Sequence, residues 1–351
     1  MSIAITGTGS YIPPRIVTNQ DFIQHEFLNS NGTPFTQPNP VIIDKFRAIT
    51  GIKERRYAPD ELNTSDMGFL AAEKAIADAA IDKNTIDHII FAHNFGDIAQ
   101  GQNQGDTVPS LATRVKHHLQ IQNANCVAYD ILFGCPGWVQ GVIQAKAFID
   151  AGIAKTCLVI GAETLSRIVD PFDRDSMIYA DGAGAAIVQA HNGGGNILAH
   201  ASATHATKEA FYLFFGNSYN KKEDSAQYIK MHGRKIYEFA LTHVPQAMKT
   251  CLDQSGSDIG AVKKIFIHQA NAKMDEAIVK RFYALYDKEP PSGVMPMSIG
   301  ELGNSSVATI PTLFDRVRKG KMKNQQVQKG DVVIFASVGA GMNINAITYQ
   351  I

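Results

Sequence analysis

The sequence predicts an α/β protein in which helices cover the faces of sheets. Short apolar runs of strand length alternate along the chain with longer segments whose apolar residues recur at helical spacing. The same order of elements resumes after a glycine-rich stretch at residues 191–196, near the middle of the chain. Strand, helix and strand in alternation imply right-handed crossovers and a mostly parallel sheet, so we expect two similar α/β halves.

The first half, residues 1–190, supplies two strands with a helix between them. Residues 86–92 and 155–161 are short apolar runs, which predict buried strands. Residues 138–151 carry apolar side chains at helical spacing and predict the helix. A strand–helix–strand unit of this kind is the repeating element of α/β folds.

The second half, residues 191–351, resumes the pattern. Strands are predicted at residues 264–268 and 331–337, and helices at residues 273–286 and 306–318. This similar order indicates a duplicated α/β unit, although no residue-level repeat is visible.

Two further segments predict loops on the surface of this core. Residues 29–40 are rich in Asn, Gly and Pro, and residues 93–109 contain three glycines.

Composition excludes several classes of protein. The chain has 351 residues with 33 basic and 33 acidic side chains, so it lacks the positive excess of an electrostatic nucleic-acid binder. No window approaches the ~18 apolar residues of a membrane span, and the first residues do not read as a signal peptide. Four cysteines in a chain this long are too few for a disulfide framework, which favours reduced thiols in the cytoplasm. We therefore expect a cytoplasmic enzyme.

Cys135 is a candidate nucleophile because it lies where an extended apolar run turns into a helix. A thiol there is close to unpaired backbone N–H groups and to the positive end of the helix dipole, and both favour the thiolate. A buried structural cysteine produces the same local pattern, so the position alone leaves both interpretations open. The other cysteines lie inside strand-like or helix-like runs and are predicted to be structural: Cys126, Cys157 and Cys251.

His268 and Asn304 are candidates from the second half. His268 ends a predicted strand, and ligands of open α/β folds bind at the carboxyl edge of the sheet. Asn304 precedes a predicted helix, where a capping role is the simpler interpretation. The glycine turn at residues 337–341 follows the last strand and is suited to aim backbone N–H groups at an oxyanion.

Two other kinds of site are excluded by spacing. The segment that begins at Gly7 lacks the third glycine of a dinucleotide fingerprint, because Ile12 stands there. No spacing of Cys and His matches a zinc site, so we expect no metal.

Taken together, these segments resemble the type III β-ketoacyl-acyl-carrier-protein synthases. The Cys, His and Asn motifs of that family are matched in order and spacing by Gly134-Cys135-Pro136-Gly137, His268-Gln269-Ala270-Asn271 and Gly303-Asn304-Ser305-Ser306. Further matches extend over nearly the whole chain, in residues 7–13, 50–55, 170–174, 179–186 and 339–341. The resemblance implies a thiolase fold, with two duplicated halves in a five-layer αβαβα arrangement, and a homodimer.

The resemblance also implies a two-step acyl transfer without a cofactor. An acyl thioester would acylate Cys135, with the backbone N–H groups of Cys135 and Ala340 holding the oxyanion. His268 and Asn304 would then stabilise the enolate formed when a malonyl thioester loses carbon dioxide, and the product would be a β-ketoacyl thioester. The expected substrates are thioesters of coenzyme A and of acyl carrier protein, in fatty-acid initiation or a related lipid pathway.

Departures from the family pattern bear on the donor of the acyl group. Lys45 stands where many members have a tryptophan that stacks on the adenine of coenzyme A, and Ile49 replaces a nearby arginine, whereas Arg174 matches the family's other adenine-contacting arginine. Val338 and Gly339 correspond to substrate-binding positions.

An acidic carrier protein requires a basic docking patch. Lys273 occupies a docking position of the family and Arg234 and Lys235 are plausible additions, while Glu238 weakens the patch. Solvated surface charge is the simpler interpretation of all four.

The loop at residues 93–109 is longer than in housekeeping members and points to a specialised enzyme. Some relatives that join two bulky acyl groups, in dialkylresorcinol, alkylquinolone or olefin pathways, recruit an acidic base near this loop. Asp97 and Asp106 are candidates for that base, although loop aspartates are commonly only solvated. A non-catalytic ketosynthase partner subunit is the alternative outside enzymes, and the retained Cys, His and Asn count against it.

Overall fold

The computed structural model describes residues 2–222 and 226–351, and its core consists of two mixed sheets. The first sheet has five strands, in the order β1 (Ser2–Tyr11), β7 (Asp181–His191), β6 (Thr156–Thr164), β4 (His88–Ala92) and β5 (Val127–Ile131). The second has four, in the order β11 (Val262–Ile267), β12 (Val332–Gly339), β13 (Asn343–Gln350) and β8 (Asn196–Thr204). The chain passes from the first sheet to the second through the glycine-rich break between β7 and β8.

The expectation of mostly parallel sheets is wrong. β4 runs parallel to β5 and β6, and β11 runs parallel to β12, but the remaining neighbours are antiparallel. The physical reason is visible at β12 and β13, which are joined by the three-residue turn Ala340–Met342. A parallel partner requires a crossover of about a dozen residues, so a connection this short leaves the next strand antiparallel.

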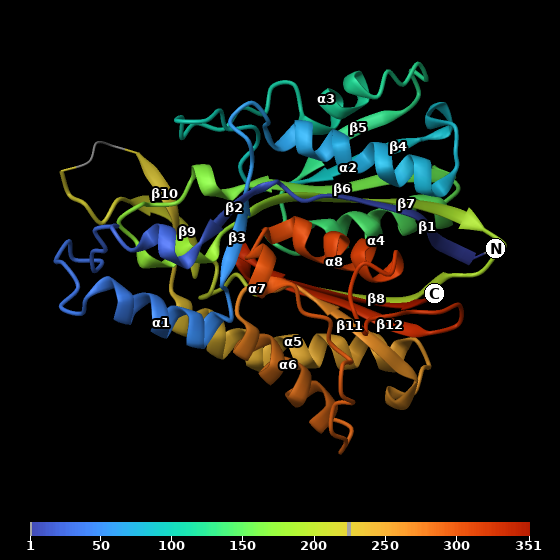
Figure 1. The fold of residues 1–351 in the computed structure, drawn as a ribbon. Helices are drawn as coiled ribbons and strands as arrows, with labels where there is room; N and C mark the ends of the chain where they lie inside the picture. Colours follow the sequence, from blue (N-terminus) through green and yellow to red (C-terminus); the bar gives the residue numbers. More distant parts are fainter. Residues whose placement is uncertain (1, 223–225) are drawn as a thin grey trace.

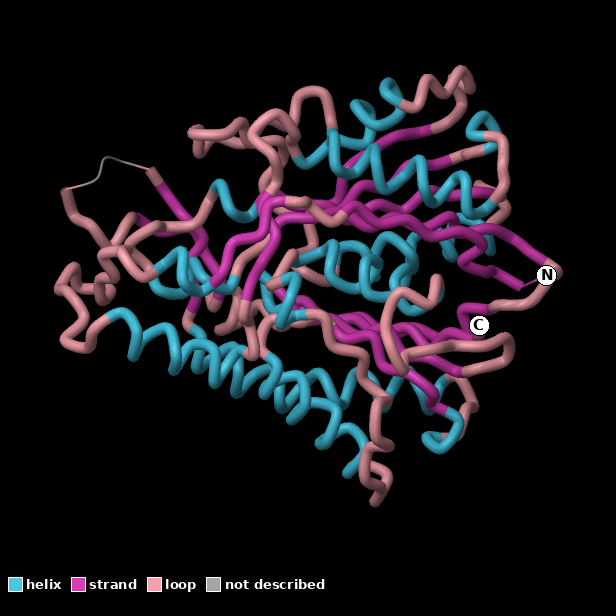
Figure 2. The backbone as a smooth tube through the Cα atoms, in the orientation of Figure 1, coloured by secondary structure: helices cyan, strands magenta, loops and turns pink. Residues whose placement is uncertain are grey.

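Helices and sheets alternate in five layers (Figure 1). The outer face of the first sheet is covered by α2 (Thr64–Ala79) and α3 (Leu111–His118). Between the sheets lie α4 (Gly137–Asp150) and α8 (Thr309–Arg318), and the far face of the second sheet is covered by α5 (Gly233–Gln254) and α6 (Ala272–Ala284). The backbone trace in Figure 2 shows the same layers, which are those of the thiolase fold expected from the resemblance.

The middle layer is held by apolar side chains from both halves. Trp138 on α4 is 1% exposed, and its ring packs edge-on against Phe335 of β12. Phe314 of α8 also packs edge-on against Phe335, with ring centroids 5.0 Å apart. Such aromatic contacts contribute about 0.5–1.5 kcal/mol each beyond burial, so the two halves share one core and fix each other's position.

Smaller elements surround the ends of the sheets at the left of Figure 1. They are α1 (Asn39–Thr50), α7 (Ile299–Leu302), the ribbon of β2 (Arg15–Thr18) and β3 (Glu54–Tyr57), and the ribbon of β9 (Leu213–Asn217) and β10 (Gln227–Met231).

The predicted strands and helices agree closely with the observed ones, with two local differences. The predicted loop at residues 29–40 ends early, because α1 begins at Asn39 with Pro40 in its first turn, a position that tolerates proline. The predicted helix at residues 306–318 begins as the 3-10 turn Ser306–Ala308 and becomes α-helical only at Thr309. Among the described residues, no helix has the length and apolarity to cross a membrane.

Candidate active site

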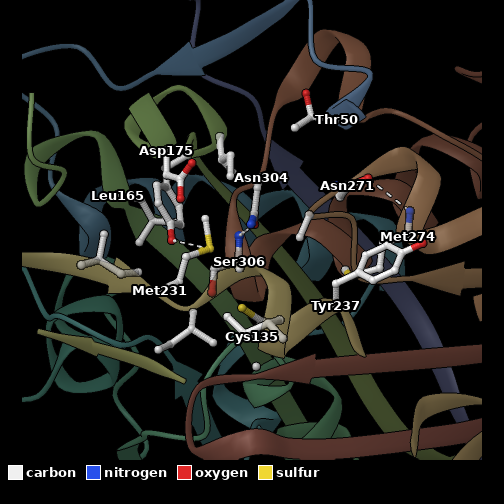
Figure 3. Close-up of a pocket in the computed structure, with 18 of the residues that line it drawn as sticks. Thr50, Cys135, Leu165, Asp175, Met231, Tyr237, Asn271, Met274, Asn304 and Ser306 are labelled. Atoms are coloured by element: carbon white, nitrogen blue, oxygen red, sulfur yellow. Dashed lines mark hydrogen bonds between the residues drawn. The ribbon is translucent and has the colours of Figure 1, made fainter. Parts of the chain in front are cut away.

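One cavity of about 670 Å³ contains the three predicted catalytic side chains. Cys135 comes from the first half, whereas His268 and Asn304 come from the second, and all three line this cavity. Figure 3 shows Cys135 and Asn304 next to Ser306, a further residue of the same wall. The structure therefore brings together residues that are up to 169 positions apart in the sequence.

Cys135 lies between the end of β5 and the start of α4, in a turn that depends on two glycines. Gly134 adopts a left-handed φ of 66°, and a Cβ there would lie 2.6 Å from the backbone nitrogen of Ala340. A Cβ on Gly339 would lie 2.4 Å from the backbone nitrogen of Cys135. The glycines thus allow the two backbone segments that carry the predicted oxyanion donors to lie in direct contact.

His268 follows β11 directly, and its backbone N–H donates to Ala336 of β12 at 2.9 Å. The next residue, Gln269, is fully buried and hydrogen-bonds the loop that contains Pro296 and Ser298. Its Nε2 donates to the carbonyl of Pro296 at 2.7 Å, and its Oε1 accepts from the backbone N–H of Ser298 at 2.9 Å. These bonds fix His268 relative to the segment that leads to Asn304.

Asn304 is anchored across the two halves of the molecule. Its backbone N–H donates to Ile178 at 3.0 Å and its carbonyl accepts from Ala180 at 2.8 Å, in a bridge to the first half. Its side-chain Oδ1 accepts from the backbone N–H of Ser306 at 2.8 Å. Because the acceptor end of the amide is engaged in this way, the Nδ2 donor is the end available to a molecule in the cavity.

Enclosure keeps both Cys135 and His268 uncharged near neutral pH. Burial raises the pKa of the Cys135 thiol to about 11, with a hydrogen bond from Ser306 acting in the opposite direction. Burial likewise lowers the pKa of His268 to about 4, opposed by a hydrogen bond with the backbone of Ser306. Burial of Cys135 therefore opposes the thiolate that the helix N-terminus favours, because removing a charge from water is costly.

The other predicted site residues divide into two groups. Those that line the cavity are Lys45, Ile49, Arg174, Arg234, Val338, Gly339 and Ala340. Lys235 and Lys273 are exposed and do not line it.

Several of these basic side chains already have neighbours. The guanidinium of Arg174 lies 5.4 Å from the ring centre of Phe35, and that of Arg234 pairs with Glu238 at 2.8 Å. The ammonium of Lys235 lies 5.4 Å from the ring centre of Tyr212.

Asp97 and Asp106 do not line the cavity of their own chain. Asp97 is buried and accepts hydrogen bonds from the backbone N–H and hydroxyl of Ser65 at 2.7 and 2.6 Å. Arg114 pairs with both carboxylates at 2.8 Å, through separate guanidinium nitrogens. Within this chain, both aspartates hold the long loop in place.

The cavity also contains polar residues that the sequence analysis did not identify: Asn94, Asp175 and Ser306. Asn94 donates through Nδ2 to the hydroxyl of Ser306 at 3.2 Å and also to Glu163 Oε1. Burial and the adjacent Asp173 raise the pKa of Asp175 to about 6. Asn94 and Glu163 stand at the carboxyl ends of β4 and β6, so the edge rule that identified His268 was a usable signal for both.

The rest of the lining is mainly apolar, as expected for a site that accepts an acyl chain. Its apolar members include Phe46, Ile49, Phe95, Leu165, Leu213, Phe215, Ile229, Met231, Ile236, Met274 and Met342. Within residues 2–222 and 226–351, no group of three or more His, Cys, Asp or Glu side chains is arranged to hold a metal ion.

Comparison with known proteins agrees with this geometry. The family model for 3-oxoacyl-[acyl-carrier-protein] synthase III matches residues 129–206, and the model for its C-terminal part matches residues 252–351. A β-ketoacyl-[acyl-carrier-protein] synthase III from Oceanobacillus iheyensis is 33% identical over 100% of this chain and 99% of its own length. This chain belongs to the 3-oxoacyl-[acyl-carrier-protein] synthase III family.

Other members of the synthase III family match over similar lengths. The synthase III 1 of Vibrio vulnificus is 32% identical over 96% of both chains. The crystal structure of the synthase III from Aquifex aeolicus has a TM-score of 0.80 and 28% identity, and covers 99% of this chain and 100% of its own. A structure of OleA from Xanthomonas campestris has the same TM-score of 0.80 at 16% identity, which is a likeness of fold alone.

Proposed function

We propose that this synthase III family member forms β-ketoacyl thioesters by acylating Cys135 and then condensing the acyl group with a malonyl thioester. The observation that carries the proposal is the single cavity shared by Cys135, His268 and Asn304. A reactive thiol, a neutral imidazole and a carboxamide donor in an apolar enclosure are the groups that a decarboxylative condensation requires.

In the first step, the sulfur of Cys135 attacks the carbonyl carbon of an acyl thioester. His268 is neutral, so it accepts the thiol proton as the carbon–sulfur bond forms, and then passes it to the departing thiol. The backbone N–H groups of Cys135 and Ala340 are the donors for the tetrahedral oxyanion. The close contact at Gly134 and Gly339 supports this pairing.

In the second step, a malonyl thioester takes the place of the departed thiol. The Asn304 Nδ2 group donates a hydrogen bond to its thioester carbonyl, and His268 does so in the tautomer whose single N–H faces the cavity. The bond to the carboxylate breaks, carbon dioxide leaves, and the resulting enolate carbon attacks the acyl carbonyl on Cys135. The cysteine sulfur is released as a thiolate and takes a proton from solvent, which completes the cycle. The side chains and backbone N–H groups named above stabilise the charge that develops in each step, so we propose that thioesters are the substrates and that no resident cofactor is needed.

A carrier protein is the proposed partner of the cavity mouth. Acyl carrier proteins are acidic, and the basic side chains Arg234, Lys235 and Lys273 are exposed on neighbouring parts of α5 and α6. Coenzyme A thioesters are the alternative donors, supported by Arg174 at the cavity lining. The four cysteines are all free thiols, which supports a cytoplasmic location.

We further propose a homodimer formed along the edge of the first sheet. β5 is one of the two outer strands of that sheet, and within residues 2–222 and 226–351 no strand pairs with its free edge. Apolar side chains beside it are exposed, with 50% for Val127, 70% for Leu132 and 84% for Val108. A monomeric mass in solution at micromolar concentration, measured by light scattering, would contradict the dimer.

A second candidate reaction is the joining of two bulky acyl thioesters, in specialised lipid pathways. The size of the cavity and its extensive apolar lining favour it, because an acetyl-sized primer would fill only a small part of this volume.

Mass spectrometry tests both reactions. The purified protein is exposed to acyl-coenzyme A substrates of increasing chain length, and then to malonyl thioester labelled in its free carboxyl group. We expect an acyl adduct on Cys135, no adduct in Cys135→Ala, and release of labelled carbon dioxide with the product. Absence of any adduct would favour a non-catalytic partner subunit, and product formed without loss of carbon dioxide would favour the second candidate.

A further inference from the structure

Glu163 is a buried carboxyl group near the catalytic cysteine that the proposed reaction does not use. It is the penultimate residue of β6 and is 1% exposed. Its Oε1 accepts a hydrogen bond from Asn94 Nδ2, whereas its Oε2 has no hydrogen-bond partner among the described residues. Because a buried carboxylate with one oxygen left unpaired is costly, the neutral acid is the form that this environment favours.

Hydrogen bonds connect Glu163 to the nucleophile. Asn94 donates to the hydroxyl of Ser306 at 3.2 Å as well as to Glu163. The Ser306 side chain hydrogen-bonds the Cys135 thiol, and its backbone N–H donates to Asn304 Oδ1 at 2.8 Å. Because the backbone of Ser306 also hydrogen-bonds His268, Glu163 supports, through Asn94, a residue that contacts all three proposed catalytic side chains.

The charged groups near Glu163 act against its ionisation. Asp181 of β7 and the Cys135 thiol are the ionisable groups that interact with it, and both are negative when ionised. Burial, the larger cause, raises the pKa of Glu163 to about 8, and the hydrogen bonds from Asn94 act in the opposite direction. By the same interaction, a charged Glu163 raises the pKa of the Cys135 thiol.

We propose that Glu163 is a positioning residue for the nucleophile. As a neutral acid it holds Asn94 and Ser306 against Cys135 without placing a charge beside the sulfur. When Glu163 loses its proton to solvent, the new charge disfavours the thiolate. The proposal rests on the proposed function only in taking Cys135 as the reacting thiol.

The test is the pH profile of Cys135 alkylation by iodoacetamide, which requires no natural substrate. The rate constant is measured by intact mass between pH 6 and 10 in the wild type and in Glu163→Gln, which imitates the neutral acid and keeps the acceptor for Asn94. Cys135→Ala reports alkylation at the other cysteines. Thermal unfolding of each variant verifies that it is folded.

We expect the ratio of the alkylation rate of Glu163→Gln to that of the wild type to change with pH. The two proteins react at similar rates below about pH 7, and Glu163→Gln becomes faster by about threefold to tenfold above pH 9, since one unit of thiol pKa is a tenfold change in thiolate. A ratio that is the same at every pH would overturn the proposal, because a merely structural role predicts a constant effect.

Two variants keep the proposal testable if Glu163→Gln does not fold. In the plot of alkylation rate against pH, the slope is expected to change where Glu163 loses its proton. Asn94→Ala removes a hydrogen bond that favours the charged carboxylate, so this change in slope should move to higher pH. In Ser306→Ala, the rate should fall by a similar factor at every pH, while the change in slope stays where it is in the wild type. An Asn94→Ala profile that superimposes on the wild type would contradict the link through Asn94. Failure of acylation by thioesters alongside the expected alkylation profile would count against the proposed function and leave this inference standing.

Discussion

Replacement of Gly134 by alanine tests the contact that brings the two proposed oxyanion donors together. Gly134 has a φ of 66°, in the left-handed region, and a Cβ there would meet the backbone nitrogen and oxygen of Ala340 at 2.6 and 2.8 Å. Both partners are backbone atoms, so the overlap is relieved only if the two segments move apart. The variant is therefore expected to lose both stability and the alignment of the Cys135 and Ala340 N–H groups.

Gly152 provides a matched control for the backbone conformation. Its φ is 70°, and a Cβ added there would have no atom within 4 Å. Gly152→Ala should cost only the left-handed penalty of about 1–2 kcal/mol. Gly134→Ala should cost that amount plus about 1–3 kcal/mol for the overlap. The difference between the two variants isolates the close approach of the two segments.

Urea unfolding and the rate of Cys135 acylation by an acyl-coenzyme A measure the two effects. We expect acylation to fall by about 10²-fold to 10³-fold in Gly134→Ala, as for loss of one oxyanion donor, and to stay near wild type in Gly152→Ala. Equal losses of stability in the two variants, with normal acylation in Gly134→Ala, would refute the argument from close backbone contact.

The remaining predictions concern a donor, an acid response and a buried ion pair. Asn304→Asp keeps an acceptor for Ser306 but lacks the Nδ2 donor, so malonyl decarboxylation should fall by about 10²-fold while single-turnover acylation of Cys135 stays within a few-fold; equal losses in both steps would count against the assigned role. The pKa of His268 is about 4 in the folded protein, whereas its ordinary value is near 6.5. Between those two pH values the unfolded chain binds a proton that the folded chain does not, so stability should decline by up to about 3 kcal/mol as the pH is lowered through this range. His268→Gln should flatten the decline. Lys230→Met leaves the buried Asp170 and Asp173 without their ammonium partner, at 2.6 and 3.1 Å, and should cost about 3–5 kcal/mol in urea unfolding. Arg15→Met removes an exposed pair with Asp60 and should lower the free energy of unfolding by at most about 1 kcal/mol. Similar losses of stability in Lys230→Met and Arg15→Met would contradict the role of burial.

Local signals in the sequence were sufficient to predict the strands β4, β6, β11 and β12 and the helices α4, α6 and α8. The spacing of apolar residues in residues 138–151 reflects only which side of a single helix is buried, and the observed α4 differs from the predicted helix by a single residue at each end. The direction of the strands was not predictable in the same way. It depends on whether the chain between two strands is long enough to cross over, and the turn between β12 and β13 is too short.

The site shows the same division between local and non-local information. Cys135, His268 and Asn304 each stand at the end of an element, and the sequence places such ends at one edge of the sheets. Asn94 and Glu163 also stand at strand ends, but they are 69 positions apart, and no local signal in the sequence indicates that the two side chains are in contact. The charge states of Cys135 and His268 were also beyond local reasoning, because the enclosure that shifts their pKa values is built from both halves of the chain.

These shifted pKa values determine when charge appears in the cavity. With the thiol at about 11 and the imidazole at about 4, a resting ion pair between Cys135 and His268 is strongly disfavoured. Proton transfer to His268 is therefore expected only as the sulfur bonds to a carbonyl carbon, when the negative charge passes to the carbonyl oxygen. In the proposed mechanism, the backbone N–H groups of Cys135 and Ala340 then donate hydrogen bonds to that oxygen. An arrangement that favours the charged transition state over a charged resting enzyme accelerates acylation without storing a reactive thiolate.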